Sequence, residues 1–138
     1  MDDSAPDRAV PMTAAQLVAE AAALIAHVTP QQAAAERAGA EVVLLDVREP
    51  AEWAHHIEGA VRIPRGLLEF HADPTSPRHD PALDPGRRVI VYCQTGIRSV
   101  LATATLRRLG FTDVVNMTGG FTAWADAGLP TVVLRPEA

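Results

Sequence analysis

The stretch RRVIVYCQTGIRSVLATATLRRLG, residues 87–110, contains an apolar run, a short loop and a helical segment in immediate succession. The run RVIVY is rich in β-branched residues and too short for a helix, which predicts a strand buried on both faces. Ala102, Leu106 and Leu109 recur at helical spacing, and Gly110 marks the end of that helix. A buried strand that leads through a loop into a helix is the basic unit of a parallel sheet.

Similar units lie on both sides of this stretch. EVVLLDV, residues 41–47, is a second buried run, DVVNM, residues 113–117, is a weaker one, and TVVL, residues 131–134, is a possible fourth. GFTAWADAG, residues 120–128, is a second short helical segment. Strands that alternate with helices imply parallel pairing through right-handed crossovers. We therefore predict an α/β fold with a central, mostly parallel sheet flanked by helices.

The first 40 residues predict a two-helix N-terminal extension that packs on the domain, over residues 13–40. Residues 1–12 show no periodicity and are expected to form a flexible arm. Thr13 and Thr29 each have a glutamine three residues later, the pattern of a capping box, so a helix is predicted to begin at each. The first helix is expected to continue to Val28.

The first of these helices is apolar on one side. Leu17, Leu24 and Ile25 belong to this stripe, which is expected to pack on the core of its own chain or to form a homodimer interface. Monomer and homodimer therefore both stay open. Farther along, residues 66–86 are rich in proline and predict a long surface loop with one helical turn near its beginning.

Composition limits the classes of partner. A chain of 138 residues with 48% hydrophobic residues fits one domain with its own core. The formal charge of −5 argues against nucleic acid or an anionic membrane as a partner. One cysteine allows no internal disulfide, and the acidic, polar N-terminus does not resemble a secretory signal. We expect a cytoplasmic protein.

That single cysteine, Cys93, follows the strand at residues 88–92 and precedes a helix. Ligands of parallel sheets bind beyond the carboxyl ends of the strands, and loop and helix amides there can converge on a negative charge. Those amides and nearby Arg98 favour a thiolate, while Gly96 allows a tight turn. The alternative is that Cys93 is only a small buried hydrophobic residue. The glycine and arginine at these spacings favour a reactive cysteine.

Three motifs in this order resemble a single-domain rhodanese, a sulfurtransferase. They are LLDVREPAEWAHHIEGAVRIP at residues 44–64, VIVYCQTGIRS at residues 89–99 and MTGGFTAWADAGLPTV at residues 117–132. The resemblance covers about residues 41–133 and implies a rhodanese-like domain over residues 41–138.

The resemblance implies that Cys93 takes the outer sulfur of a donor such as thiosulfate, becomes a persulfide and passes the sulfur to cyanide or a thiol, with no cofactor. The acceptor comes from outside because the chain has no second cysteine, and it could be a protein thiol. Arg98 would orient an anionic donor. The other loop residues would supply hydrogen-bond donors; they are Gln94, Thr95, Gly96, Ile97 and Ser99.

Two other functions are alternatives to sulfur transfer. Phosphatases and arsenate reductases on a related fold have five residues between cysteine and arginine, whereas only four separate Cys93 from Arg98, and Tyr92 stands where a histidine is common. A smaller ring suits a sulfur atom better than a tetrahedral oxyanion. The second alternative is a non-catalytic binding module, although degenerate modules of this type usually lack the cysteine.

Asp46 and Arg48 end the strand at residues 41–47, on the same edge of the sheet as Cys93. We interpret them as an ion pair that supports the site rather than as groups that react. The neighbouring histidines His55 and His56 are adjacent rather than three or four residues apart, so no metal site is predicted.

Overall fold

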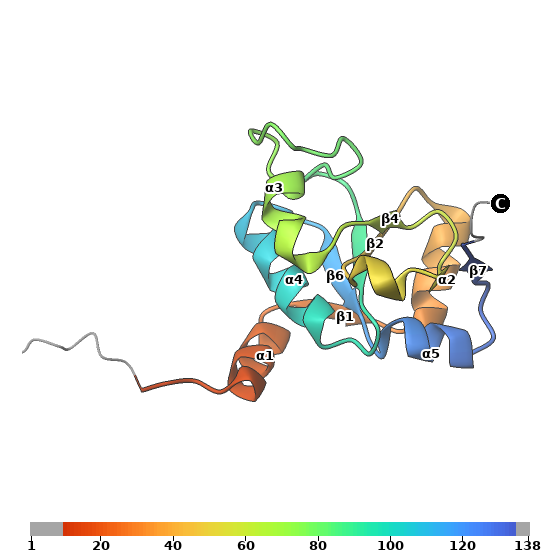
Figure 1. Ribbon diagram of the computed structural model, residues 1–138, viewed down its shortest axis with the longest axis horizontal. Coiled ribbons are helices and arrows are strands. Elements are labelled where there is room, and N and C mark those ends of the chain that lie inside the picture. Colours follow the sequence, from red (N-terminus) through yellow and green to blue (C-terminus); the bar gives the residue numbers. More distant parts are fainter. Residues whose placement is uncertain (1–9, 135–138) are drawn as a thin grey trace, which may run out of the picture.

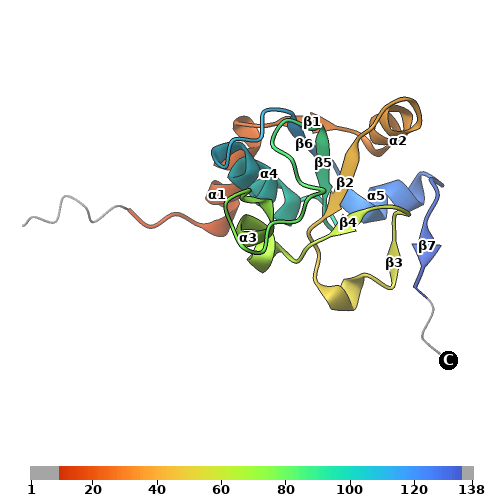
Figure 2. The same ribbon diagram turned by 90° about the horizontal axis from the view of Figure 1, so that it is seen from above.

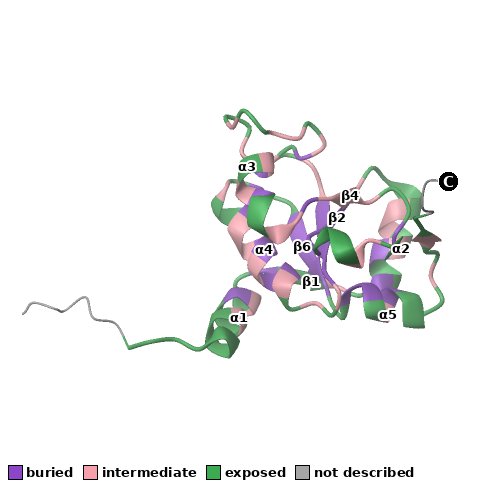
Figure 3. Cartoon of the chain, viewed as in Figure 1, coloured by how far each residue is buried: buried purple, intermediate pink, exposed green. Residues whose placement is uncertain are grey.

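The computed structural model describes residues 10–134 and is built around a five-stranded sheet in which all neighbouring strands are parallel (Figure 1). The strands in spatial order are β1 (Ala26–Val28), β6 (Val114–Met117), β5 (Val89–Tyr92), β2 (Val43–Asp46) and β4 (Val61–Arg62). Every residue of β2, β5 and β6 is buried (Figure 3). This burial on both faces is why these segments are continuous apolar runs.

Helices cover both faces of the sheet (Figure 2). One face carries η3 (Arg65–Leu67), α3 (Leu68–Ala72) and α4 (Arg98–Arg108), and α1 (Ala14–Ala23) packs on the outside of α4. The opposite face carries α2 (Pro30–Gly39) and α5 (Gly120–Asp126). The prediction of an α/β fold with a mostly parallel central sheet is confirmed.

A small second sheet stands beside the main one. β3 (His55–His56) and β7 (Val132–Val133) pair antiparallel, and the short helix η2 (Pro50–Glu52) lies just before β3. β7 falls within the weakest of the predicted strands, whereas β3 was not predicted. Two-residue strands carry no periodicity of their own, so only their pairing partner identifies them.

The N-terminal region differs from the sequence prediction at one point. Both predicted capping boxes are present, at Thr13 and Thr29. However, α1 ends at Ala23 and the chain then forms β1, an edge strand paired with β6, instead of remaining helical to Val28. Pairing with β6 satisfies the backbone groups of this segment and turns Val28 toward the core under α2 and α5.

The predicted division of the chain at residue 40 stays a prediction, and the structure shows that the segment before it supplies a strand as well as two helices. Of the expected arm over residues 1–12, residues 1–9 lie outside the described residues. The loop over residues 66–86 begins with η3 and α3 and buries Leu68, Ala72 and Leu83 in the core.

The apolar side of α1 is only partly covered. Ile25 is buried against α4, but Leu17 and Leu24 are 45% and 64% exposed. The choice between monomer and homodimer therefore stays open. Among residues 10–134, no helix has the length and apolar character needed to cross a membrane.

Candidate active site

Cys93 follows β5 directly, and the loop that begins with it leads into α4. The residue is buried, and its sulfur accepts hydrogen bonds from the backbone N–H groups of Gly96, at 3.1 Å, and Ser99, at 3.3 Å. Ser99 belongs to the first turn of α4, whose unpaired amides and dipole favour negative charge. The loop therefore forms a small cradle around one sulfur atom, with donors aimed at it.

The beginning of α5 holds the other side of this loop. The Phe121 N–H donates to the carbonyl oxygen of Cys93 at 2.8 Å, and the Thr122 N–H donates to that of Gln94 at 3.0 Å. Gly120 makes this approach possible, because a Cβ on it would lie 2.5 Å from the Cys93 oxygen. Gly96 faces this turn, with φ +93° and with Gly119 in the space that its own Cβ would take. The GGFT segment, residues 119–122, was not predicted to belong to the site, although its adjacent glycines were a signal for a close approach of two backbones.

Asp46 and Arg48 form a fully buried ion pair below the loop. The Arg48 guanidinium donates to both carboxylate oxygens of Asp46, with a shortest distance of 2.8 Å. It also donates to the Gln94 side chain at 2.9 Å and stacks on the ring of Phe121. Arg48 thus connects β2 to the cysteine loop and to α5, and its supporting role stays a proposal.

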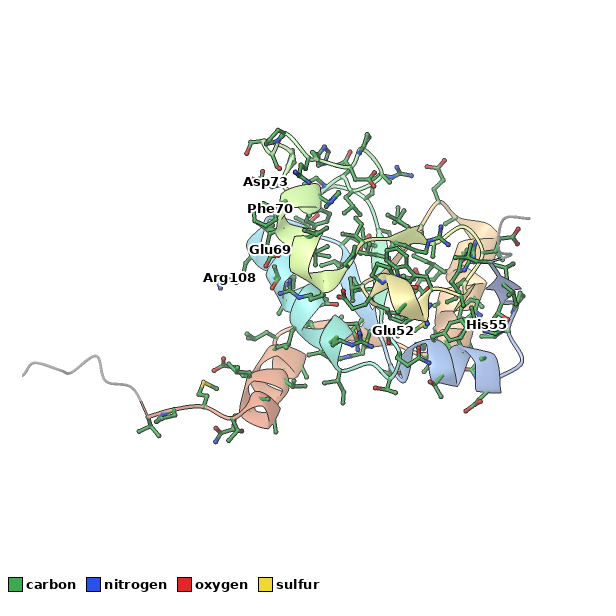
Figure 4. The ribbon with its side chains drawn as sticks, viewed as in Figure 1. Glu52, His55, Glu69, Phe70, Asp73 and Arg108 are labelled. Atoms are coloured by element: carbon green, nitrogen blue, oxygen red, sulfur yellow. The ribbon has the colours of Figure 1, made fainter. Side chains whose placement is uncertain are left out.

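Arg98, the first residue of α4, points to η2 rather than standing free beside the sulfur. Its guanidinium donates two hydrogen bonds of 2.8 Å to the carboxylate of Glu52, which Figure 4 shows on η2. These bonds are the main reason why the pKa of Glu52 falls from an ordinary 4.5 to about 2. Glu52 therefore stays charged and occupies the donors that the sequence analysis assigned to an anionic substrate.

Ser99 extends the site in a third direction. Its hydroxyl lies 3.4 Å from the Cys93 sulfur and donates to Oδ1 of Asn116, on β6, at 2.6 Å. The Asn116 amide in turn contacts His27 on β1. Neither Asn116 nor His27 was a candidate from the sequence, since they are far from Cys93 along the chain.

The remaining predicted loop residues lie around the opening. Thr95 and Ile97 are exposed, and Gln94 is partly buried and donates to the Thr122 hydroxyl at 3.0 Å. Within residues 10–134, no group of three or more metal-binding side chains is close enough to hold an ion.

The family comparison agrees with the three motifs. Residues 29–127 match the model of the rhodanese-like domain. A sulfurtransferase from Allochromatium vinosum is 38% identical over 98 residues, which cover 70% of this chain and 82% of that protein. A probable adenylyltransferase/sulfurtransferase from Mycobacterium tuberculosis is also 38% identical, over 97 residues, but the chain spans only 23% of its length.

Solved structures show the same fold. A protein of unknown function from Rhodopseudomonas palustris, described as a possible tyrosine phosphatase, superposes with a TM-score of 0.81 and 35% identity, over 89% of this chain and 96% of that one. A polysulfide-sulfur transferase homodimer from Wolinella succinogenes superposes with a TM-score of 0.69 and 30% identity, over 84% of each chain.

Proposed function

Because the chain belongs to the rhodanese-like domain family, we propose that it transfers a sulfane sulfur from a donor to a thiol or cyanide acceptor through a persulfide on Cys93. The observation that carries this proposal is the position of the Cys93 sulfur under the N–H groups of Gly96 and Ser99. Both donors stabilise a thiolate at this position, which is the anion that attacks in the first step and leaves in the second.

The reaction divides into two displacements. In the first, the Cys93 thiolate attacks the outer sulfur of the donor, a new S–S bond forms, and the rest of the donor leaves with the electron pair of the broken bond. In the second, the acceptor attacks the outer sulfur of the persulfide, and the Cys93 thiolate leaves. Each step exchanges one bond for another and needs no cofactor.

The donor and acceptor are the finer part of the proposal. Thiosulfate is a suitable test donor, but it would compete with Glu52 for the guanidinium of Arg98. This competition favours donors of lower charge, such as a persulfide on a small thiol or a protein. Cyanide or a thiol would take the sulfur, and the single unpaired thiol suits the reducing conditions of the cytoplasm.

The geometry of the loop weighs against a phosphatase. Only four residues separate Cys93 from Arg98. The Arg98 guanidinium is bound to the carboxylate of Glu52 and so is not free to bind a phosphate group. Tyr92 precedes the cysteine, and burial keeps its pKa above the usual range, so it supplies no ionised group. A non-catalytic binding module needs no thiolate, and the donors on the Cys93 sulfur favour an enzyme over it.

The direct test is the mass of the intact protein after incubation with thiosulfate. We expect a gain of one sulfur atom, which disappears when cyanide is added and thiocyanate is produced. Cys93→Ser is the matched control, because it keeps the size of the side chain and the loop amides but removes the thiolate.

Three other outcomes would contradict the proposal. A wild-type protein that neither gains sulfur from thiosulfate or an alkyl persulfide nor produces thiocyanate would favour the binding module. A sulfur gain that persists in Cys93→Ser would place the reaction elsewhere. Hydrolysis of an aryl phosphate without any sulfur uptake would favour the phosphatase.

A further inference from the structure

A chain of hydrogen bonds connects the buried thiol of Cys93 to an exposed histidine. Ser99 lies 3.4 Å from the Cys93 sulfur, the Ser99 hydroxyl lies 2.6 Å from Oδ1 of Asn116, and Nδ2 of Asn116 lies 3.2 Å from Nδ1 of His27. Ser99 and Asn116 are buried, whereas His27 is exposed on the edge strand β1. His27 also lies outside residues 29–127, the part of the chain that matches the family model.

The direction of each hydrogen bond follows from its partners. Nε2 of His27 lies 3.0 Å from the carbonyl oxygen of Ala22, which can only accept, so this nitrogen carries a proton. In neutral His27, Nδ1 must then accept from the Asn116 Nδ2 group, which turns Oδ1 of Asn116 toward Ser99. The Ser99 hydroxyl consequently donates to Asn116 and can offer only a lone pair to Cys93.

We propose that His27 is a positioning residue for Cys93: through Asn116 it sets the direction of the Ser99 hydroxyl and so the number of donors on the sulfur. When His27 gains a proton on Nδ1, that nitrogen becomes a donor, and the Asn116 amide turns over to present Oδ1 to it. Asn116 then donates to Ser99, and the Ser99 hydroxyl hydrogen is free to donate to the sulfur.

The consequence is a third hydrogen bond to the thiolate form of Cys93, beside those from the N–H groups of Gly96 and Ser99. Neutral His27 favours the thiol, which can donate to Ser99, whereas charged His27 favours the thiolate. A hydrogen bond to a charged group should change the thiolate-to-thiol ratio by about tenfold between the two states of His27. The inference rests on the proposed use of this sulfur in transfer.

The charged groups around His27 do not provide a simpler switch. Glu20 is the charged residue within α1, and α4 carries Arg98, Arg107 and Arg108, whereas β6 has none. Arg107 donates to the carbonyl oxygen of Leu24, and no ion pair involves His27 among the described residues. The path of hydrogen bonds from His27 to the sulfur therefore runs through Asn116 and Ser99.

The test is a pH titration of the full chain that follows the ultraviolet absorbance of the thiolate, taken as the difference from Cys93→Ser. In the wild type, thiolate formation should depend on two coupled groups, Cys93 and His27. The thiolate-to-thiol ratio of Cys93 at a given pH should be about ten times higher with His27 charged than with His27 neutral. His27→Phe and Ser99→Ala should each titrate as a single group. Ser99→Thr should restore the coupling, because it keeps the hydroxyl.

Ser99→Ala is the decisive variant, because it leaves the charge of His27 in place. Coupling that survives in Ser99→Ala would mean that charge acts through space, and this would overturn the proposal. His71→Phe is the matched control and should keep the wild-type curve, since His71 lies on α3 and takes no part in the hydrogen bonds that join His27 to Cys93. A wild-type curve that fits one group would also overturn the proposal.

A second measurement covers the case in which His27→Phe does not fold. Coupling is reciprocal, so at pH values where the ultraviolet absorbance shows Cys93 as a thiolate, NMR should find a larger protonated fraction of the His27 ring in the wild type than in Cys93→Ser. Equal fractions at those pH values would contradict the proposal. Neither measurement needs sulfur transfer, so a failure of the proposed function and a failure of this inference are distinguishable.

Discussion

At the level of single residues, each arginine of the site forms an ion pair with one carboxylate. Arg48 is buried with Asp46, and Arg98 is bound by Glu52 at the opening of the site. Removing one partner of the pair between Asp46 and Arg48 should strongly destabilise the fold, because it leaves a buried charge without compensation. The second pair is partly exposed, with 40% of Arg98 and 30% of Glu52 accessible, so water reduces its strength.

The pair between Glu52 and Arg98 predicts a pH-dependent loss of stability. The pKa of Glu52 is lowered from 4.5 to about 2, so the pair stabilises the fold above about pH 4.5 and loses this effect as the pH falls toward 2. Glu52→Gln should therefore have a lower free energy of unfolding than the wild type near neutral pH, by about 1 kcal/mol or less, measured by urea unfolding. This difference should become smaller in acid.

The matched control is Glu20→Gln, because Glu20 makes no ion pair among the described residues. This variant should follow the wild type near neutral pH. If the difference between the wild type and Glu52→Gln stayed constant from neutral pH into the acid range, the interpretation of this pair would be wrong.

At the scale of elements, the cysteine loop is held between β5, α4 and the start of α5. Gly120 has φ +61°, and its missing Cβ leaves room for the carbonyl oxygens of Cys93 and Gln94. Gly110, at the end of α4, has φ +97° with nothing near its Cβ position. Both glycines therefore have the left-handed backbone conformation that a residue with a Cβ rarely adopts, but only Gly120 touches the site.

This contrast predicts different effects for two alanine variants. Gly120→Ala should destabilise the protein by about 1–3 kcal/mol through backbone strain and should also displace α5 from the loop, which reduces sulfur transfer by about tenfold or more. Gly110→Ala should lose a similar stability and keep its transfer rate. Urea unfolding and thiocyanate production measure the two effects separately; equal activity in both variants would count against a role for α5 in holding the loop.

At the scale of the whole molecule, the sheet has a separate apolar core on each face. Leu106 lies in the core under α3 and α4, and Trp124 lies in the core under α2 and α5. The same strands form the floor of both cores, since successive side chains point to opposite faces. The two cores should consequently unfold together.

Leu106→Ala tests this coupling. The variant leaves a cavity at a fully buried position and should lower the free energy of unfolding by about 2–5 kcal/mol. With Trp53 replaced by Phe in both proteins, so that Trp124 is the one fluorescent tryptophan, the unfolding transitions followed by circular dichroism and by fluorescence should shift by the same amount, although Trp124 is on the other face. Leu67→Ala, at an exposed position, should change stability by less than about 1 kcal/mol. Separate transitions for the two signals would contradict a single cooperative unit.

Local sequence patterns were enough to predict the central strands, both capping boxes, the helix after Cys93 and the family. These features are encoded by neighbouring residues: a buried strand needs a continuous apolar run, and a cap needs a polar residue at a fixed distance. The cysteine loop was predicted for the same reason, and its individual roles stay predictions. The helix predicted to continue to Val28 was wrong, because apolar spacing alone does not distinguish the end of a helix from an edge strand.

The tertiary structure alone decided which groups meet at the sulfur. β1, β3 and β4 are two or three residues long and exist only through their pairing partners. Glu52 meets Arg98 across 46 positions of sequence, and Asn116 meets His27 across 89. Such contacts depend on the order of the strands in the sheet, which cannot be inferred from patterns of neighbouring residues. The sequence therefore predicted which atom reacts, and the fold determined which side chains surround it.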